Sequence, residues 1–120
     1  MQYDLEERTL KFAKEVIGFV KTLPKTRANA EISRQVIRSS GSVGANYIEA
    51  NEALSKKDFI MRIKICRKES RETAYWLKLA EVKNPEGEKQ RETLIEEATQ
   101  LTKIFSSIVE KSRPGSSEPI

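Results

Sequence analysis

The sequence predicts an all-α protein, an up-down-up-down antiparallel four-helix bundle. Apolar residues recur at three- and four-residue steps in four segments, as they do on one face of a helix. No segment alternates at a period of two, so no sheet is expected. Short connections join the four segments, and short connections place successive helices antiparallel. With 120 residues in total, one domain over residues 1–112 is the prediction.

The first two helices are expected over residues 4–23 and 29–53. The apolar stripe of the first consists of Leu5, Phe12, Val16, Phe19, Val20 and Leu23. Pro24 ends it, because proline cannot donate to the helix ladder. Asn29 is the expected cap of the second helix. Its stripe consists of Ile32, Val36, Ser39, Val43, Tyr47, Ala50 and Leu54.

Two glycines lie inside the second helix, at positions 41 and 44. Each costs about 1 kcal/mol relative to alanine in a helix interior. One interpretation is a local break near Ser40 and Gly41. The other, which we favour because the apolar period continues in phase, is the close approach of another backbone.

The third and fourth helices are expected over residues 56–82 and 88–111. Ser55 can cap the third, with Asp58 three residues later. Its inward face consists of Phe59, Ile63, Cys66, Ser70, Thr73, Ala74 and Leu77. Residues 84–87, Asn-Pro-Glu-Gly, read as a turn. The stripe of the fourth helix consists of Leu94, Ala98, Leu101, Phe105, Ile108 and Val109, and residues 113–120 are expected to be a disordered tail.

The composition excludes several function classes. There is one cysteine, Cys66, and no histidine, so a Cys/His zinc site and the His-dependent modes of nucleophile activation are excluded within one chain. A ferritin-like di-metal site also needs histidine. No apolar run reaches the roughly 18 residues of a membrane span, and the N-terminus has no apolar signal core. We expect a cytoplasmic, non-enzymatic protein with no cofactor, metal, membrane or small-molecule substrate, and Cys66 as a small buried hydrophobe.

Positive charge is concentrated in the third helix. The chain carries a net charge of +4 and has a pI of about 9.2, but residues 55–71 alone hold seven Lys or Arg against two acidic residues. On a helical wheel, one edge of this helix carries Lys57, Lys64, Lys68, Arg71, Tyr75 and Lys78. A row of cations with an aromatic residue suits a phosphate backbone and a stacked base. The alternative is an ordinary solvated face.

Two helices carry a second apolar edge beside the core stripe. In the third helix it includes Ile65 and Trp76, and in the second it includes Ile37, Gly44 and Ile48. A monomeric bundle needs one stripe per helix, so the extra edges predict a subunit interface. The alternative is that broad core faces absorb these residues.

The sequence IRSSGSVGANYIEANEALSKKDFIMRIKICRKESRETAYWL, residues 37–77, resembles the bacterial four-helix-bundle family of intervening-sequence proteins. These are named for reading frames inside insertions of large-subunit ribosomal RNA genes. The runs SVGANYIEA (42–50) and SKKDFI (55–60) carry the resemblance most specifically. Many relatives read Asn-x-x-Glu-Gly where this chain has Asn46, Glu49 and Ala50, which puts tight packing there in doubt.

The resemblance implies a homo-pentamer with a central channel and no established enzymatic activity. The family is similar in fold to the accessory protein of diversity-generating retroelements, a basic pentamer that binds nucleic acid and a reverse transcriptase. Three functions therefore compete: an oligomer that binds RNA or DNA, a scaffold for a protein encoded nearby, and a small nuclease. The absence of histidine argues against the nuclease, and the basic row favours nucleic acid.

Overall fold

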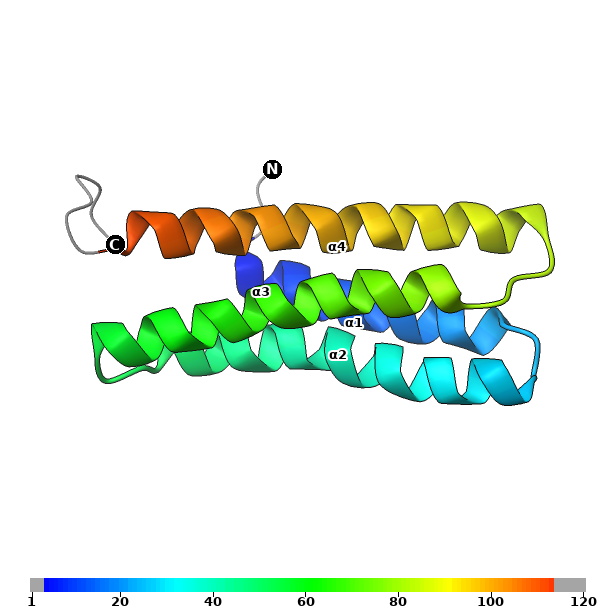
Figure 1. Ribbon diagram of the computed structural model, residues 1–120, viewed down its shortest axis with the longest axis horizontal. Coiled ribbons are helices and arrows are strands. Elements are labelled where there is room, and N and C mark those ends of the chain that lie inside the picture. Colours follow the sequence, from blue (N-terminus) through cyan, green and yellow to red (C-terminus); the bar gives the residue numbers. More distant parts are fainter. Residues whose placement is uncertain (1–3, 114–120) are drawn as a thin grey trace.

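The protein is an antiparallel bundle of four helices, as predicted (Figure 1). The computed structural model describes residues 4–113. The helices are α1 (Leu5–Thr22), α2 (Arg27–Asn51), α3 (Lys56–Leu79) and α4 (Pro85–Lys111), and this part of the chain contains no strand. Each helix packs against its neighbours around the bundle, α2 most extensively against α3. The backbones of diagonal helices are not in contact, but side chains meet across the core, where the ring centroids of Tyr47 in α2 and Phe105 in α4 lie 6.1 Å apart. The predicted tail lies outside the described residues apart from Arg113.

A polar side chain caps the start of every helix. Asp4, Thr26, Ser55 and Asn84 each accept a hydrogen bond from the backbone N–H three residues later, at 2.8–3.0 Å. The cap predicted at Ser55 is confirmed. The cap predicted at Asn29 is wrong, because Thr26 takes that place and α2 begins earlier. The turn predicted at residues 84–87 is also wrong, since Asn84 caps α4 and Pro85 occupies its first position.

The core follows the predicted stripes closely. Its largest fully buried side chains include Phe12, Phe19, Ile63, Leu101 and Phe105. Leu54 is the clear error: it lies beyond the end of α2 and is 100% exposed. Cys66 is buried, as predicted, and its thiol donates to the Val43 carbonyl at 3.4 Å. Ala50 is also buried, so the alanine that replaces the family's glycine packs within the core.

α2 is continuous through both glycines, so there is no break near Ser40. A Cβ atom at Gly44 would lie 3.0 Å from Oγ1 and 3.3 Å from Cβ of Thr9 in α1. A Cβ atom at Gly41 would meet nothing within 4 Å. The predicted close approach is therefore confirmed at Gly44, where α1 is the neighbour, and wrong at Gly41.

Asn29 ties the two loops at one end of the bundle together. Its side-chain amide donates to the carbonyls of Pro24 and Glu81, both at 2.9 Å, and its Oδ1 accepts from the Glu81 N–H at 2.9 Å. The side chain is buried, and all three bonds run to backbone groups. Asn29 thus joins the α1–α2 connection to the α3–α4 connection.

Candidate nucleic-acid and subunit interfaces

The predicted basic row is solvent-exposed along the whole outer face of α3. Lys57, Lys64, Lys68, Arg71, Tyr75 and Lys78 are all exposed. At 1.5 Å per residue, the row is about 30 Å long. The core-facing residues Ile63, Cys66 and Leu77 lie on the opposite side of the helix, so the row takes no part in folding the bundle.

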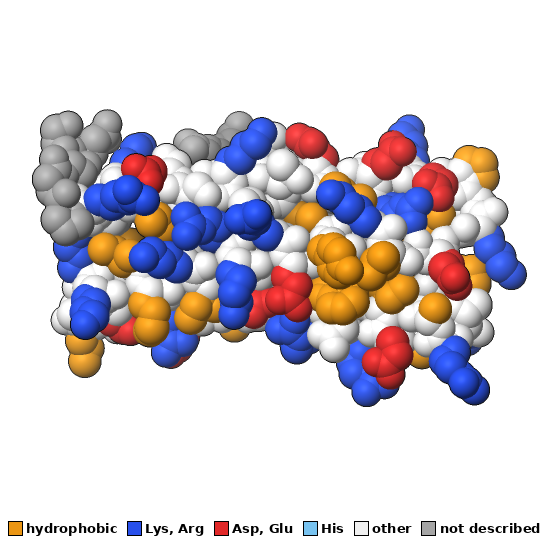
Figure 2. All heavy atoms as spheres, in the orientation of Figure 1, with side chains coloured by type: hydrophobic (Ala, Val, Ile, Leu, Met, Phe, Trp, Pro, Cys, Tyr) orange, Lys and Arg blue, Asp and Glu red, His pale blue; other side chains and the backbone are white. Residues whose placement is uncertain are grey.

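The charges of this row are not neutralised by ion pairs within residues 4–113. Every ion pair in that range takes its cation from outside the row: Arg8, Lys11, Arg34, Arg38, Arg91 and Arg113. Figure 2 shows Lys and Arg side chains gathered over the N-terminal half of α3 and the adjoining part of α4. Two further arginines of α3, Arg62 and Arg67, are half-buried. Arg62 donates to Oδ1 of Asn46 at 3.2 Å.

An aromatic pair lies at the C-terminal end of the basic row. The rings of Tyr75 and Trp76 meet edge to face, with centroids 5.4 Å apart. Tyr75 is 57% exposed, whereas Trp76 is half-buried and packs against the margin of the core. Figure 2 shows hydrophobic side chains gathered over this half of α3. An exposed tyrosine in line with a row of cations can stack on a base while the cations contact phosphates.

A polar network between α2 and α3 fixes the position of Trp76. Its indole N–H donates to Oε1 of Glu72 at 3.0 Å, and the same oxygen pairs with Arg38. Arg38 also pairs with Glu69, whose side chain is buried, at 3.3 Å. This network was not predicted from the sequence, because it depends on which turns of α2 and α3 are level with each other.

The predicted interface residues lie on two separate surfaces. Ile37 and Ile48, which are exposed, share an edge of α2 with Gly44, and Gly44 faces α1. Ile65 and Trp76 instead lie on the edge of α3 beside α2. The missing side chain of Gly44 is explained by Thr9 of the same chain, and its place in a subunit interface stays a prediction.

Sequence reasoning missed two residues of the first surface, Leu10 and Ile17 of α1. They are 56% and 40% exposed. Their spacing of seven places them on one edge of α1, away from the core stripe, and this spacing was the available signal. On the second surface, Met61 and Leu79 are exposed beside Ile65 and Trp76, as their helical spacing predicts. Apart from Leu54, the exposed large hydrophobic residues of the described chain belong to one of these two surfaces or, like Tyr75, border one.

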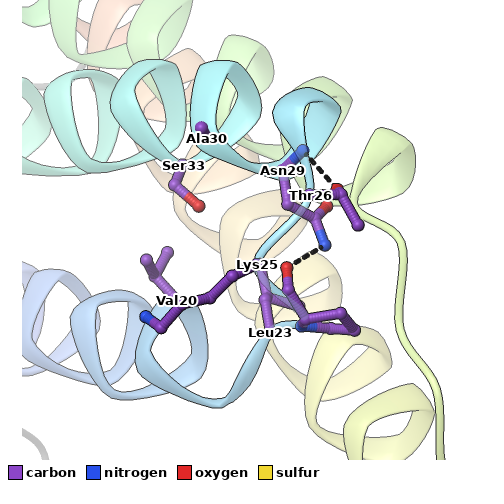
Figure 3. Close-up of a pocket in the computed structure, with 8 residues that line it drawn as sticks. Val20, Leu23, Lys25, Thr26, Asn29, Ala30 and Ser33 are labelled. Carbon is purple, nitrogen blue, oxygen red and sulfur yellow. Dashed lines mark hydrogen bonds between the residues drawn. The ribbon is translucent and has the colours of Figure 1, made fainter.

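A hollow of about 450 Å³ lies where α1 meets α2 at the loop end of the bundle (Figure 3). Half of its lining residues are apolar, namely Val20, Leu23, Pro24 and Ala30, and half are polar, namely Lys25, Thr26, Asn29 and Ser33. The Asn29 amide beside it is turned toward the Pro24 carbonyl and is fully hydrogen-bonded. The hollow therefore combines apolar surface with one lysine and three neutral polar side chains.

The described residues contain no cluster of His, Cys, Asp or Glu that could hold a metal ion. Burial raises the pKa of the Cys66 thiol to about 12, so it is a poor nucleophile at neutral pH. Within residues 4–113, no helix is long and apolar enough to cross a membrane. Among the described residues, the conspicuous surface features are the exposed basic row and the exposed apolar side chains.

These features define a small all-helical protein built on a four-helix bundle. Residues 1–107 match the family described as 23S rRNA-intervening sequence protein, and the chain belongs to this family. A solved structure from Bacteroides thetaiotaomicron, a protein of unknown function from the S23 ribosomal protein family, is 33% identical. The match covers 89% of this chain and 99% of that one, with a TM-score of 0.74. The comparison with curated proteins finds no match.

Proposed function

We propose that the protein is a non-catalytic, cytoplasmic homo-oligomer, a pentamer, that binds the backbone of RNA or DNA through the basic face of α3. The observation that carries the proposal is the exposure of Lys57, Lys64, Lys68 and Arg71 in one row without carboxylate partners among residues 4–113. Lys and Arg that are held away from intrachain carboxylates remain available to phosphate oxygens.

One row gives weak binding on its own. Four phosphate contacts correspond to a loss of affinity of about 50- to 150-fold between 50 and 200 mM salt, the smaller value applying to single strands. An oligomer repeats the row on a single particle, so several rows act on the same polymer and raise the effective concentration. Contacts to phosphates carry no sequence information, so little sequence preference is expected.

A charge reversal with a matched control tests the proposal. Lys64→Glu with Lys68→Glu should abolish binding of labelled RNA and DNA in a low-salt anisotropy assay. Lys14→Glu with Lys21→Glu changes the net charge equally at exposed positions of α1, the helix diagonal to α3 in the bundle, and should keep most of the binding. Equal losses in the two double variants would show that only net charge matters, and no binding by the natural protein would end the proposal.

The second candidate function is a scaffold for a protein partner encoded nearby. The observation that favours it is Leu54, which is fully exposed beside the cap of α3 and is unusual for a side chain of its size. If the natural protein binds no nucleic acid at low salt, this function takes precedence. Leu54→Ser should then weaken capture of the partner while leaving the fold unchanged.

A further inference from the structure

Exposed and partly exposed apolar side chains form two surfaces that lie on different sides of α2. We name the first the groove: it follows α1 and α2 and consists of Leu10, Ile17, Ile37, Gly41 and Ile48, with the hollow of Figure 3 at its end. We name the second the ridge: it follows one edge of α3 and consists of Met61, Ile65, Trp76 and Leu79. Because the two surfaces lie on different sides of α2 and the α1 and α3 backbones are not in contact, one chain cannot close its ridge on its own groove.

We propose that the ridge of one copy of this chain packs into the groove of the next, with Leu79 entering the hollow. The inference rests on the proposed self-association and names the surfaces that form it. Contacts between two unlike surfaces are heterologous, and a repeated heterologous contact closes into a ring when its rotation allows. A two-fold dimer would need only one self-complementary surface.

The ridge and the groove lie at matching heights along the long axis of the bundle. Asn29 of α2 is bonded to Glu81, so Leu79, two residues earlier, is level with Ala30 in the lining of the hollow. Asn46 is bonded to Arg62, so Met61 is level with Ile48 of the groove. Rotation about an axis parallel to the bundle preserves these levels, so ridge and groove of adjacent copies meet in register.

The floor of the groove suits an incoming side chain. A Cβ atom at Gly41 would have open space around it, so the backbone there is bare. Both N–H groups of the Asn29 amide are already bonded to backbone carbonyls, so they need no partner from an incoming chain. On the ridge, the Trp76 indole N–H is bonded to Glu72, so its ring can be covered without leaving a donor unpaired.

The charges at the α2–α3 loop end of the two surfaces are complementary. Exposed Glu52 lies one turn beyond Ile48 on the groove side of α2, and exposed Lys57 lies one turn before Met61 on α3. They are level with each other, because Asn46 and Arg62 lie opposite. Between two copies in register, Glu52 at the end of the groove lies near Lys57, the first residue of the basic row, whereas Lys64, Lys68 and Arg71 lie farther along that row. Opposite charges at this end favour ridge-in-groove pairing over ridge-on-ridge pairing.

A mixing experiment tests the contact. Leu79→Lys places a charge on the ridge, and Ala30→Arg fills the hollow. Both positions are exposed, so each variant should keep the fold, and circular dichroism measures whether the helix content is unchanged. Each variant alone should lose assembly and scatter light as a monomer of 13.7 kDa. An equimolar mixture should form a dimer of two chains and nothing larger, since only one intact ridge and one intact hollow remain per pair.

Ala28→Arg is the matched control, because Ala28 is exposed two residues away but does not line the hollow. It should assemble like the natural protein. If Ala30→Arg still assembles, or if the mixture remains monomeric, the ridge-and-groove contact is wrong although self-association stands. If the natural protein is itself monomeric, self-association fails and the inference fails with it. Trp76 is the only tryptophan, so its emission should shift to shorter wavelength on assembly and not in Leu79→Lys.

Discussion

The two glycines of α2 should respond in opposite ways to the same substitution. Replacing glycine by alanine in a helix interior gains about 0.5–1 kcal/mol, because alanine loses less backbone entropy on folding. At Gly41 the added methyl group meets nothing within 4 Å, so Gly41→Ala should realise that gain. At Gly44 the same group would lie 3.0 Å from Oγ1 of Thr9.

Thr9 cannot move aside without loss. It is buried, and its hydroxyl donates to the carbonyls of Leu5 at 2.7 Å and Glu6 at 3.1 Å. Overpacking of this kind costs about 1–3 kcal/mol. Gly44→Ala should therefore be less stable than Gly41→Ala by about 1–3 kcal/mol, since the helix-propensity gain is the same in both.

Urea denaturation followed by circular dichroism measures the difference, as a shift in midpoint at constant m-value. The titration should be run at two protein concentrations, because assembly would make the midpoint concentration-dependent. Thr9→Ala should recover part of the stability that Gly44→Ala removes, and a double-mutant cycle isolates that coupling. Equal stabilisation by both alanines would refute the packing argument.

Two other predictions concern buried polar groups. Asn29→Ala should destabilise the protein by about 2–4 kcal/mol, because it removes three hydrogen bonds to the loop backbone and leaves their partners unsatisfied. Asn29→Asp should destabilise it more, since a carboxylate would then lie against two carbonyl oxygens. An unchanged urea midpoint in either variant would contradict this prediction. At pH 8, a thiolate-directed reagent should label Cys66 in the folded protein about a thousandfold more slowly than in the denatured chain. The reason is that a pKa of about 12 instead of 9.0 leaves far less of the thiol as thiolate. A labelling rate within about tenfold of the rate in the denatured chain would contradict this prediction.

Helix number, order and inward faces could be predicted because they depend on local sequence period. Each stripe repeats over several turns, so an error at one position does not change the assignment. Errors occurred at helix ends, where one hydrogen bond decides the boundary. Asn29 is of a residue type that often caps helices, but the capping hydrogen bond of α2 is accepted by Thr26. The Asn29 side chain instead bonds to the backbone of Glu81, 52 residues away.

The surfaces were predicted only in part, for a related reason. Exposure of the basic row followed from its position opposite the core stripe of α3. The division of the apolar edges into a ridge and a groove depends on which side of α2 meets which neighbour, and the period of a single helix does not contain that information. Leu10 and Ile17 belong to the groove because α1 lies beside α2, and this arrangement is not visible in the sequence of α1 alone.

The salt dependence of binding tests the central claim, that the α3 row contacts phosphates directly. For single strands, the slope of log K against log salt has a magnitude of about 0.7 for each phosphate that the protein neutralises. On a short single-stranded oligonucleotide that spans one row, the natural protein should give a slope of about −2.8, and Lys64→Gln with Lys68→Gln should give a slope about 1.4 units shallower. A slope unchanged by this double substitution, with affinity also unchanged, would contradict the account.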